Sequence, residues 1–249
     1  MNGKMETDKI KMDEIKTIEE VMLNALPSLN TLYYDEWRLR FAGGYTNRAN
    51  SVNIIAPSTI PLEEKIHHCE KIYTTQKLPT VFKISPLSLE LDDLLEQAGY
   101  ELVTKTNIMT MDLRESYGKN LTSTVTEGFY EDWQSHYFHL NETNPDKIPY
   151  AKEVQALILD QVLCAMLIRD NEVLACGMCV IEDAYVGLYD IIVSKDHRHM
   201  GYGEDICASL LEQAYQHGAR KAYIQVVASN TNAVNLYQKL GYRRMYDYW

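Results

Sequence analysis

Two closely spaced glycines, Gly201 and Gly203, stand between an apolar run and a helical pattern. The preceding run 191–193 is rich in β-branched residues, which predicts a strand. The following residues place one apolar face at helical spacing until Gly218, through Ile206, Leu210, Leu211 and Ala214. Because glycine leaves the backbone uncovered, the free amides of residues 200–204 and the positive helix end favour a phosphate or pyrophosphate. The chemistry that this stretch predicts is anion binding.

The spacing of the glycines excludes two common phosphate sites. The chain has no G-x-x-x-x-G-K-[ST] motif, and a dinucleotide fingerprint would need a third glycine where Ile206 stands. We therefore expect neither a P-loop nor a Rossmann site.

Two segments carry a family resemblance. Residues 198–203, RHMGYG, resemble the R/Q-x-x-G-x-G/A signature of the GCN5-related N-acetyltransferase (GNAT) superfamily, set behind a strand that ends in valine. Residues 230–242, NTNAVNLYQKLGY, resemble the second signature of that family, N-x-x-A-x-x-L-Y-x-x-x-G-[FY], at the expected distance downstream. The resemblance implies an acyl-CoA-dependent N-acyltransferase that uses acetyl-CoA as co-substrate and needs no metal.

The resemblance also implies which residues hold the co-substrate. The pyrophosphate would lie on the amides of Met200 to Glu204, with a charge-assisted contact from Arg198. The backbone of the strand 191–193 would pair with the amide-rich pantetheine arm. The expected binding residues are Ile191, Ile192, Val193, Arg198, His199, Met200, Gly201, Tyr202, Gly203, Glu204 and Asn230. Asn230 could instead cap the last helix, which is the usual local role of an asparagine there.

Tyr237 and Asp190 are the candidate catalytic residues. Tyr237 matches the tyrosine of the second signature, and a phenol can protonate a departing thiolate. It also continues a helical apolar stripe, so a core position is the alternative. Asp190 directly precedes the strand segment that should face the thioester and could act as general base, with Glu182 as a second choice. Either carboxylate could instead orient structure or bind a cationic acceptor.

The chain also contains an internal repeat. Residues 94–100, LLEQAGY, parallel residues 236–242, LYQKLGY, and a strand pattern follows each of them. We therefore expect an α+β fold of two tandem GNAT-like domains, each a mixed, mainly antiparallel sheet flanked by helices. Residues 1–117 would form a degenerate domain without a cofactor loop, and residues 118–249 the catalytic domain.

Local patterns predict the following elements. Helices are expected at 8–26, 62–76, 87–98, 127–140 and 151–159, and strands at 37–41, 45–55, 80–85, 106–113, 161–169, 172–182 and 185–193. Within them, Arg40 to Val52 resembles a run in bacterial acetyltransferases that carry a degenerate N-terminal domain. This run is either a hairpin with a surface-exposed polar edge or part of the wall of an acceptor pocket.

Composition limits the partners. With 35 acidic and 24 basic residues among 249, the net charge of −11 disfavours nucleic acid and anionic membranes and modestly favours a cationic acceptor, such as an amine. No signal peptide or membrane span is indicated, and five irregularly spaced cysteines suggest a reducing, cytoplasmic location. Cys176 and Cys179 match C-x-x-C but should point to opposite faces of a strand, so no metal site is expected.

The expected activity is acetyl transfer from acetyl-CoA to a primary amine of a small molecule or peptide, by direct transfer. The alternative is a non-catalytic sensor or partner-binding module that holds CoA on the same fold. The protein is expected to be a monomer or homodimer.

Overall fold

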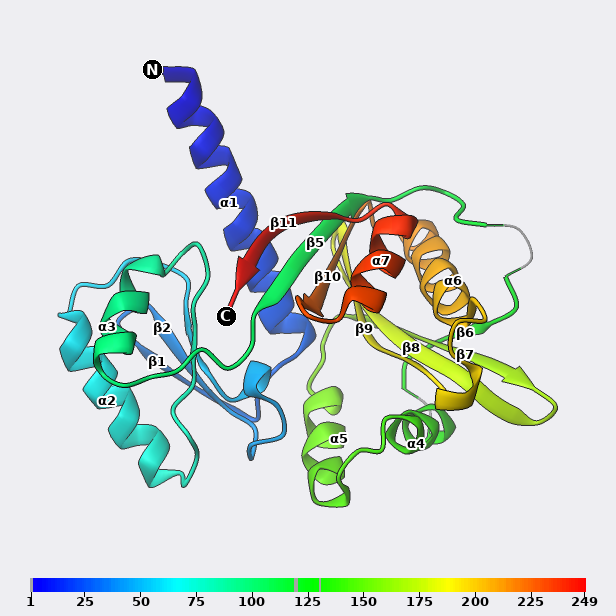
Figure 1. The fold of residues 1–249 in the computed structure, drawn as a ribbon, viewed down its shortest axis with the longest axis horizontal. Helices are drawn as coiled ribbons and strands as arrows, with labels where there is room; N and C mark the ends of the chain where they lie inside the picture. Colours follow the sequence, from blue (N-terminus) through cyan, green and yellow to red (C-terminus); the bar gives the residue numbers. More distant parts are fainter. Residues whose placement is uncertain (1, 119–120, 130) are drawn as a thin grey trace. The chain divides into compact units, whose positions relative to one another are not determined.

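The computed structural model describes residues 2–118, 121–129 and 131–249. Its contacts divide the chain into two compact units, each with its own sheet (Figure 1). Unit 1 contains the chain up to Thr106 together with residues 149–157 and 247–249, and unit 2 contains residues 107–148 and 158–246. Short segments are thus exchanged between the units, whereas the sequence suggested a single boundary between residues 117 and 118.

Unit 1 is built on a four-stranded sheet in the order β1-β2-β3-β4. β1 pairs antiparallel with β2 and β2 with β3, while β3 and β4 are parallel. A buried cluster that includes Trp37, Tyr73 and Leu91 joins the sheet to α2 and the α3 region. The elements are α1 (Asn2–Ala25), β1 (Asn30–Tyr34), β2 (Trp37–Phe41), β3 (Val52–Ile54), α2 (Leu62–Thr75), β4 (Phe82–Lys83), α3 (Asp92–Gln97) and α5 (Ile148–Ala156).

Unit 2 contains a seven-stranded sheet in the order β11-β5-β10-β9-β8-β7-β6. The strands β6 to β9 are antiparallel neighbours, and β9 and β10 are parallel. Helices α6 and α7 cover one face of this sheet and α4 lies on the other (Figure 1). The elements are β5 (Thr106–Asp112), β6 (Thr124–Glu127), α4 (Glu131–Leu140), β7 (Gln161–Arg169), β8 (Glu172–Glu182), β9 (Tyr185–Val193), α6 (Tyr202–Gln216), β10 (Lys221–Val227), α7 (Thr231–Leu240) and β11 (Arg243–Tyr248).

The predicted α+β class with two mixed sheets is confirmed, and the errors are local. β1, β6 and β10 were not predicted, and the strand expected at 45–55 is limited to β3. The helix expected at 127–140 begins only at Glu131, because residues up to Glu127 form β6. No helix of the described residues is both long enough and apolar enough to span a membrane.

The closing strands of both repeats, β5 and β11, lie in the sheet of unit 2, and only the last three residues of the chain belong to unit 1. The motif that ends α3 places Tyr100 against the core of unit 1, but the strand that follows it, β5, joins the sheet of unit 2. Trp249 pairs with Ile84 through two backbone hydrogen bonds, of 2.7 and 2.9 Å. The Trp249 indole also donates to Asp92 at 2.7 Å. Residues 247–249 therefore complete unit 1.

The run from Arg40 to Val52 exposes Asn47 and Arg48, as the surface-edge alternative expected, but buries the polar side chains of Arg40 and Asn50. Arg40 is only 4% exposed, and its guanidinium donates to the carbonyl oxygens of Leu23 and Leu26 at the end of α1. Asn50 accepts from the amides of Ala42 and Gly44, at 2.7 and 3.0 Å. Because these groups satisfy backbone atoms that would otherwise be buried without partners, the run has a structural role.

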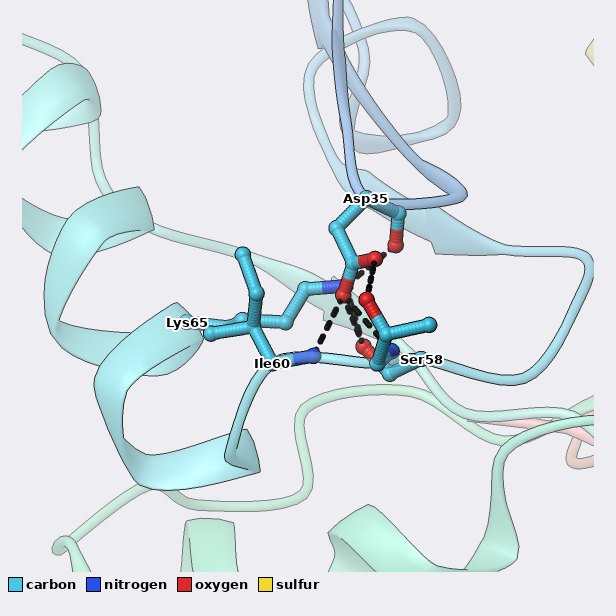
Figure 2. A network of polar contacts seen from close by, with 5 residues as sticks. Asp35, Ser58, Ile60 and Lys65 are labelled. Atoms are coloured by element: carbon cyan, nitrogen blue, oxygen red, sulfur yellow. Dashed lines mark hydrogen bonds and ion pairs between the residues drawn. The ribbon is translucent and has the colours of Figure 1, made fainter.

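A second polar network, in which only Lys65 is fully buried, fixes the β1–β2 turn to α2 (Figure 2). Asp35 accepts from the Ser58 hydroxyl at 2.8 Å, from the amide and hydroxyl of Thr59 at 2.9 and 2.7 Å, and from the Ile60 amide at 2.9 Å. The ammonium of Lys65, whose side chain is fully buried, lies 3.0 Å from the same carboxylate and 4.0 Å from the centre of the Trp37 ring. The donors, led by the Thr59 hydroxyl, hold the pKa of Asp35 well below its usual range.

Candidate active site

The stretch around Gly201 forms the predicted strand, loop and helix. β9 ends at Val193, a short 3-10 turn follows at Lys195–His197, and α6 begins at Tyr202. Gly201 precedes the helix in the left-handed conformation, with φ of 85°, which glycine adopts without steric cost. The first intrahelical bond runs from the amide of Asp205 to the carbonyl of Gly201, at 3.0 Å. The amides of residues 202–204 therefore have no acceptor within the helix and lie at its positive end.

The two glycines, Gly201 and Gly203, have different surroundings. A Cβ on Gly201 would meet nothing within 4 Å, so the backbone there faces open space. A Cβ on Gly203 would lie 3.4 Å from Leu236 of α7 and 3.5 Å from Val193 of β9. Gly201 thus exposes the loop, whereas a side chain at Gly203 would make ordinary van der Waals contacts with β9 and α7. An ion pair of 2.5 Å between Glu204 and Lys239 further joins α6 to α7.

The pairing between β9 and β10 is short. Its register covers Tyr185 to Gly187 on β9 and Lys221 to Tyr223 on β10. Beyond these pairs, in the described part of the chain, the β10 register does not reach Ile191 to Val193, so this part of β9 forms an edge on the β10 side. An open edge presents backbone donors and acceptors to an extended ligand. The predicted backbone-binding segment, Ile191 to Val193, lies on this edge.

A β-bulge in β9 changes which side chains share a face. Met178 of β8 faces Tyr189 but Cys176 faces Ile192, so β9 holds one extra residue at this point. Asp190 occupies the bulge with a φ of 55°. Val186 and Leu188, before the bulge, and Ile191 and Val193, after it, pack on the same cluster with α6. The alternation of side chains between the two faces of β9 thus shifts by one residue. As a result, Tyr189 and Asp190 both lie on the face that α4 covers.

α4 supplies a partner for Asp190. The hydroxyl of Tyr137 donates to Oδ1 of Asp190 at 3.0 Å. The Tyr137 ring stacks on Trp133, with centroids 5.5 Å apart and planes within 8°. Trp133 is itself fixed, because it is fully buried and its indole donates to the carbonyl of Ala165 at 3.1 Å. The sequence marked this aromatic helix but gave no sign that Tyr137 reaches Asp190.

A pair of tyrosines lies where the β9–β10 pairing ends. The hydroxyls of Tyr189 and Tyr223 are 3.0 Å apart, and complete burial raises the pKa of Tyr223 well above its usual value. The Tyr223 ring covers Gly187, where an added Cβ would come within 2.4 Å of it. Gly187 is therefore required by this close approach.

Tyr237 lies in the core on the α6 face and is 7% exposed. Burial raises its pKa, so the phenol is protonated at neutral pH. Its ring meets Tyr242 edge to face, with centroids 5.8 Å apart. Asn230 caps α7 by accepting from the amide of Ala233 at 3.2 Å, as the local-structure alternative predicted.

The remaining candidates lie in the loop and strands. Arg198, His199 and Met200 are exposed in the loop. Glu182 ends β8 opposite Tyr185, at the far end of β9 from the bulge. All five cysteines are buried and free, and burial raises the pKa of Cys179 to about 12. Cys179 belongs to the cluster on the α6 face of the sheet and Cys176 does not. The two thiols therefore point to opposite faces of β8, as predicted. Among the described residues, no cluster of three or more potential metal ligands occurs.

Comparison with known proteins identifies the family of this chain and supports its fold. A family model described as "Probable histone acetyltransferase Rv0428c C-terminal" matches residues 12–248. A Bacillus subtilis (strain 168) protein named "Uncharacterized N-acetyltransferase YobR" is 29% identical over 237 residues, which are 93% of this chain and 95% of that protein. Because the family model spans almost the whole chain, the chain belongs to this acetyltransferase family, within the GCN5-related N-acetyltransferases.

Solved structures show the same fold at low sequence identity. The GCN5-related N-acetyltransferase from Kribbella flavida is similar with a TM-score of 0.65 and 13% identity, covering 94% of this chain and 93% of that one. A structure titled "Tandem GNAT protein from the clavulanic acid biosynthesis pathway (without AcCoA)" is similar with a TM-score of 0.63 and 11% identity, covering 80% and 72% of the two chains. The predicted tandem GNAT architecture is confirmed.

Proposed function

We propose that this N-acetyltransferase moves an acetyl group from acetyl-CoA to a primary amine of a small molecule or peptide. The observation that carries the proposal is that the edge segment Ile191 to Val193 of β9 is followed, after one loop, by the uncapped amides at the start of α6. An edge strand suits the amide-rich pantetheine arm, and a helix N-terminus suits a pyrophosphate. Acetyl-CoA would supply an activated acyl thioester at this edge.

The residues on the α6 face would handle the donor. The amides of Tyr202, Gly203 and Glu204 would hold the pyrophosphate, and the loop arginine, Arg198, would add a charge-assisted contact. Tyr237 is protonated and on the same face, so its hydroxyl would give a proton to the departing sulfur as the C–S bond breaks.

The opposite face of β9 would receive the amine. Asp190 is partly exposed and carries a carboxylate there, which suits an ammonium ion and can accept its proton before nitrogen attacks the acetyl carbon. The bulge thus separates the proton acceptor at Asp190 from the proton donor at Tyr237. The net charge of −11 supports a cationic acceptor over a nucleic acid.

Isothermal titration with acetyl-CoA tests the donor site through Gly201→Ala. The new Cβ forces a left-handed backbone on alanine beside the free amides, and we expect the Kd for acetyl-CoA to rise roughly tenfold. Gly218→Ala is the matched control, because Gly218 ends the same helix with a φ of 101° and equally open space. It should lower stability by a similar amount and leave Kd unchanged. No binding by the wild type, or equal loss in both variants, contradicts the proposal.

A further inference from the structure

We propose that Tyr137 is a positioning residue, which orients the Asp190 carboxylate toward a primary ammonium acceptor. The inference rests on the proposed function, because it assigns the acceptor amine to Asp190. Its structural basis is the contact between α4 and the bulge of β9, where the Tyr137 hydroxyl donates to Oδ1 of Asp190 at 3.0 Å.

Asp190 needs such a partner because its backbone is held out of the regular strand. The residue occupies a bulge in the left-handed region, so ladder pairing does not fix its direction as it does for its neighbours. A short carboxylate side chain that is partly exposed would turn among several rotamers. One fixed donor on Oδ1 restricts that rotation and selects the direction in which the carboxylate meets an amine.

Tyr137 can supply that fixed point because its ring cannot move freely. The side chain is 7% exposed, and its ring lies parallel to that of Trp133 on the preceding turn of α4. The indole of Trp133 is tied to the backbone of β7. The hydroxyl position is therefore set by the packing of α4 on the sheet.

Other titratable groups also lie near Asp190. The thiols of Cys164 on β7 and Cys176 on β8 both interact electrostatically with Asp190. Burial raises the pKa of both thiols, so they are neutral at physiological pH. Tyr189, on the same face of β9, has its hydroxyl 3.0 Å from that of Tyr223. Tyr137 is the group whose hydroxyl the structure places on the carboxylate itself.

The experiment is a double-mutant cycle with Tyr137→Phe and Asp190→Asn. The probes are spermidine, lysine amide and phenylethylamine, each assayed by release of free CoA thiol from acetyl-CoA above the amine-free baseline. Tyr137→Phe keeps the stacked ring and removes only the hydroxyl, so we expect kcat/KM for the amine to fall roughly tenfold. The Kd for acetyl-CoA, measured by calorimetry, should not change. In the Asp190→Asn background, Tyr137→Phe should cause little further loss.

Tyr100→Phe is the matched control. It removes another tyrosine hydroxyl that donates to a carboxylate at 3.0 Å, that of Glu70, but in unit 1. This variant should retain the wild-type kcat/KM. Two results overturn the inference and leave the proposed acetyl transfer intact. One is a normal kcat/KM for Tyr137→Phe, and the other is an equally large fall in kcat/KM when Tyr137→Phe is added to Asp190→Asn. Failure of the wild type to bind acetyl-CoA or to release thiol with any probe overturns the proposed function, and this inference with it.

Discussion

Replacing Tyr237 with phenylalanine is expected to lower kcat roughly 100-fold or more without weakening acetyl-CoA binding. The variant keeps the ring that packs in the core against Tyr242 and removes only the hydroxyl. Burial keeps that hydroxyl protonated, so at neutral pH it is a proton donor and not a base. Without it, the thiolate must leave unprotonated or take its proton from water. Steady-state thiol release with a primary amine, beside calorimetric titration with acetyl-CoA, separates the two effects.

Tyr242→Phe provides the control for that result. Tyr242 is buried in the same cluster, and its hydroxyl has no hydrogen-bond partner among the described residues. Removing an unsatisfied buried hydroxyl should be neutral or stabilising, so kcat should stay near that of the wild type. If Tyr237→Phe turns over normally, Tyr237 is only a core residue. If the wild type binds acetyl-CoA but transfers nothing to any amine, the chain is a CoA-binding module.

Replacing Asp35 with alanine is expected to lower the thermal midpoint of unfolding by roughly 10 °C or more. The carboxylate accepts from the Ser58 and Thr59 hydroxyls and from two backbone amides, and all of these donors lose their acceptor. The ammonium of Lys65, whose side chain is fully buried, then lacks its counter-charge. A buried charge without a partner is among the most destabilising single changes. Differential scanning calorimetry measures the midpoint.

Lys65→Met is the informative companion variant. It removes the buried cation and leaves Asp35 with its hydroxyl and amide donors. The fall in the thermal midpoint should therefore be clearly smaller than in Asp35→Ala. Because the pKa of Asp35 in the folded protein lies below its ordinary value of 3.8, the stabilisation is present above that pH and is lost as the pH falls further. The difference in thermal midpoint between the wild type and Asp35→Ala should therefore become smaller in strong acid. Equal midpoints at neutral pH would show that the network contributes nothing.

Local sequence patterns predicted the parts of unit 2 that hold the donor site. β7, β8 and β9 have the predicted bounds, and α6 begins beside Gly201 as expected. These elements are specified by alternation, helical spacing and glycines within short windows of the chain. The cap formed by Asn230 is local for the same reason.

Features that depend on pairing between distant segments were not predictable in this way. Simple alternation along β9 would put Tyr189 and Asp190 on opposite faces, but the bulge puts both on the α4 face. The contact from Tyr137 to Asp190 joins residues 53 positions apart. The burial of Arg40 likewise depends on the end of α1, whose carbonyl groups it binds. Each of these features is set by which strand or helix lies opposite, which no short window of sequence contains.

The place of residues 247–249 in unit 1 has a consequence for synthesis on the ribosome. Trp249 pairs with Ile84 of unit 1 and is made after every residue of unit 2. Closing so long a loop has an entropic cost that grows with the logarithm of its length. Ile84 therefore cannot form its backbone pair with Trp249 until the whole of unit 2 has been translated.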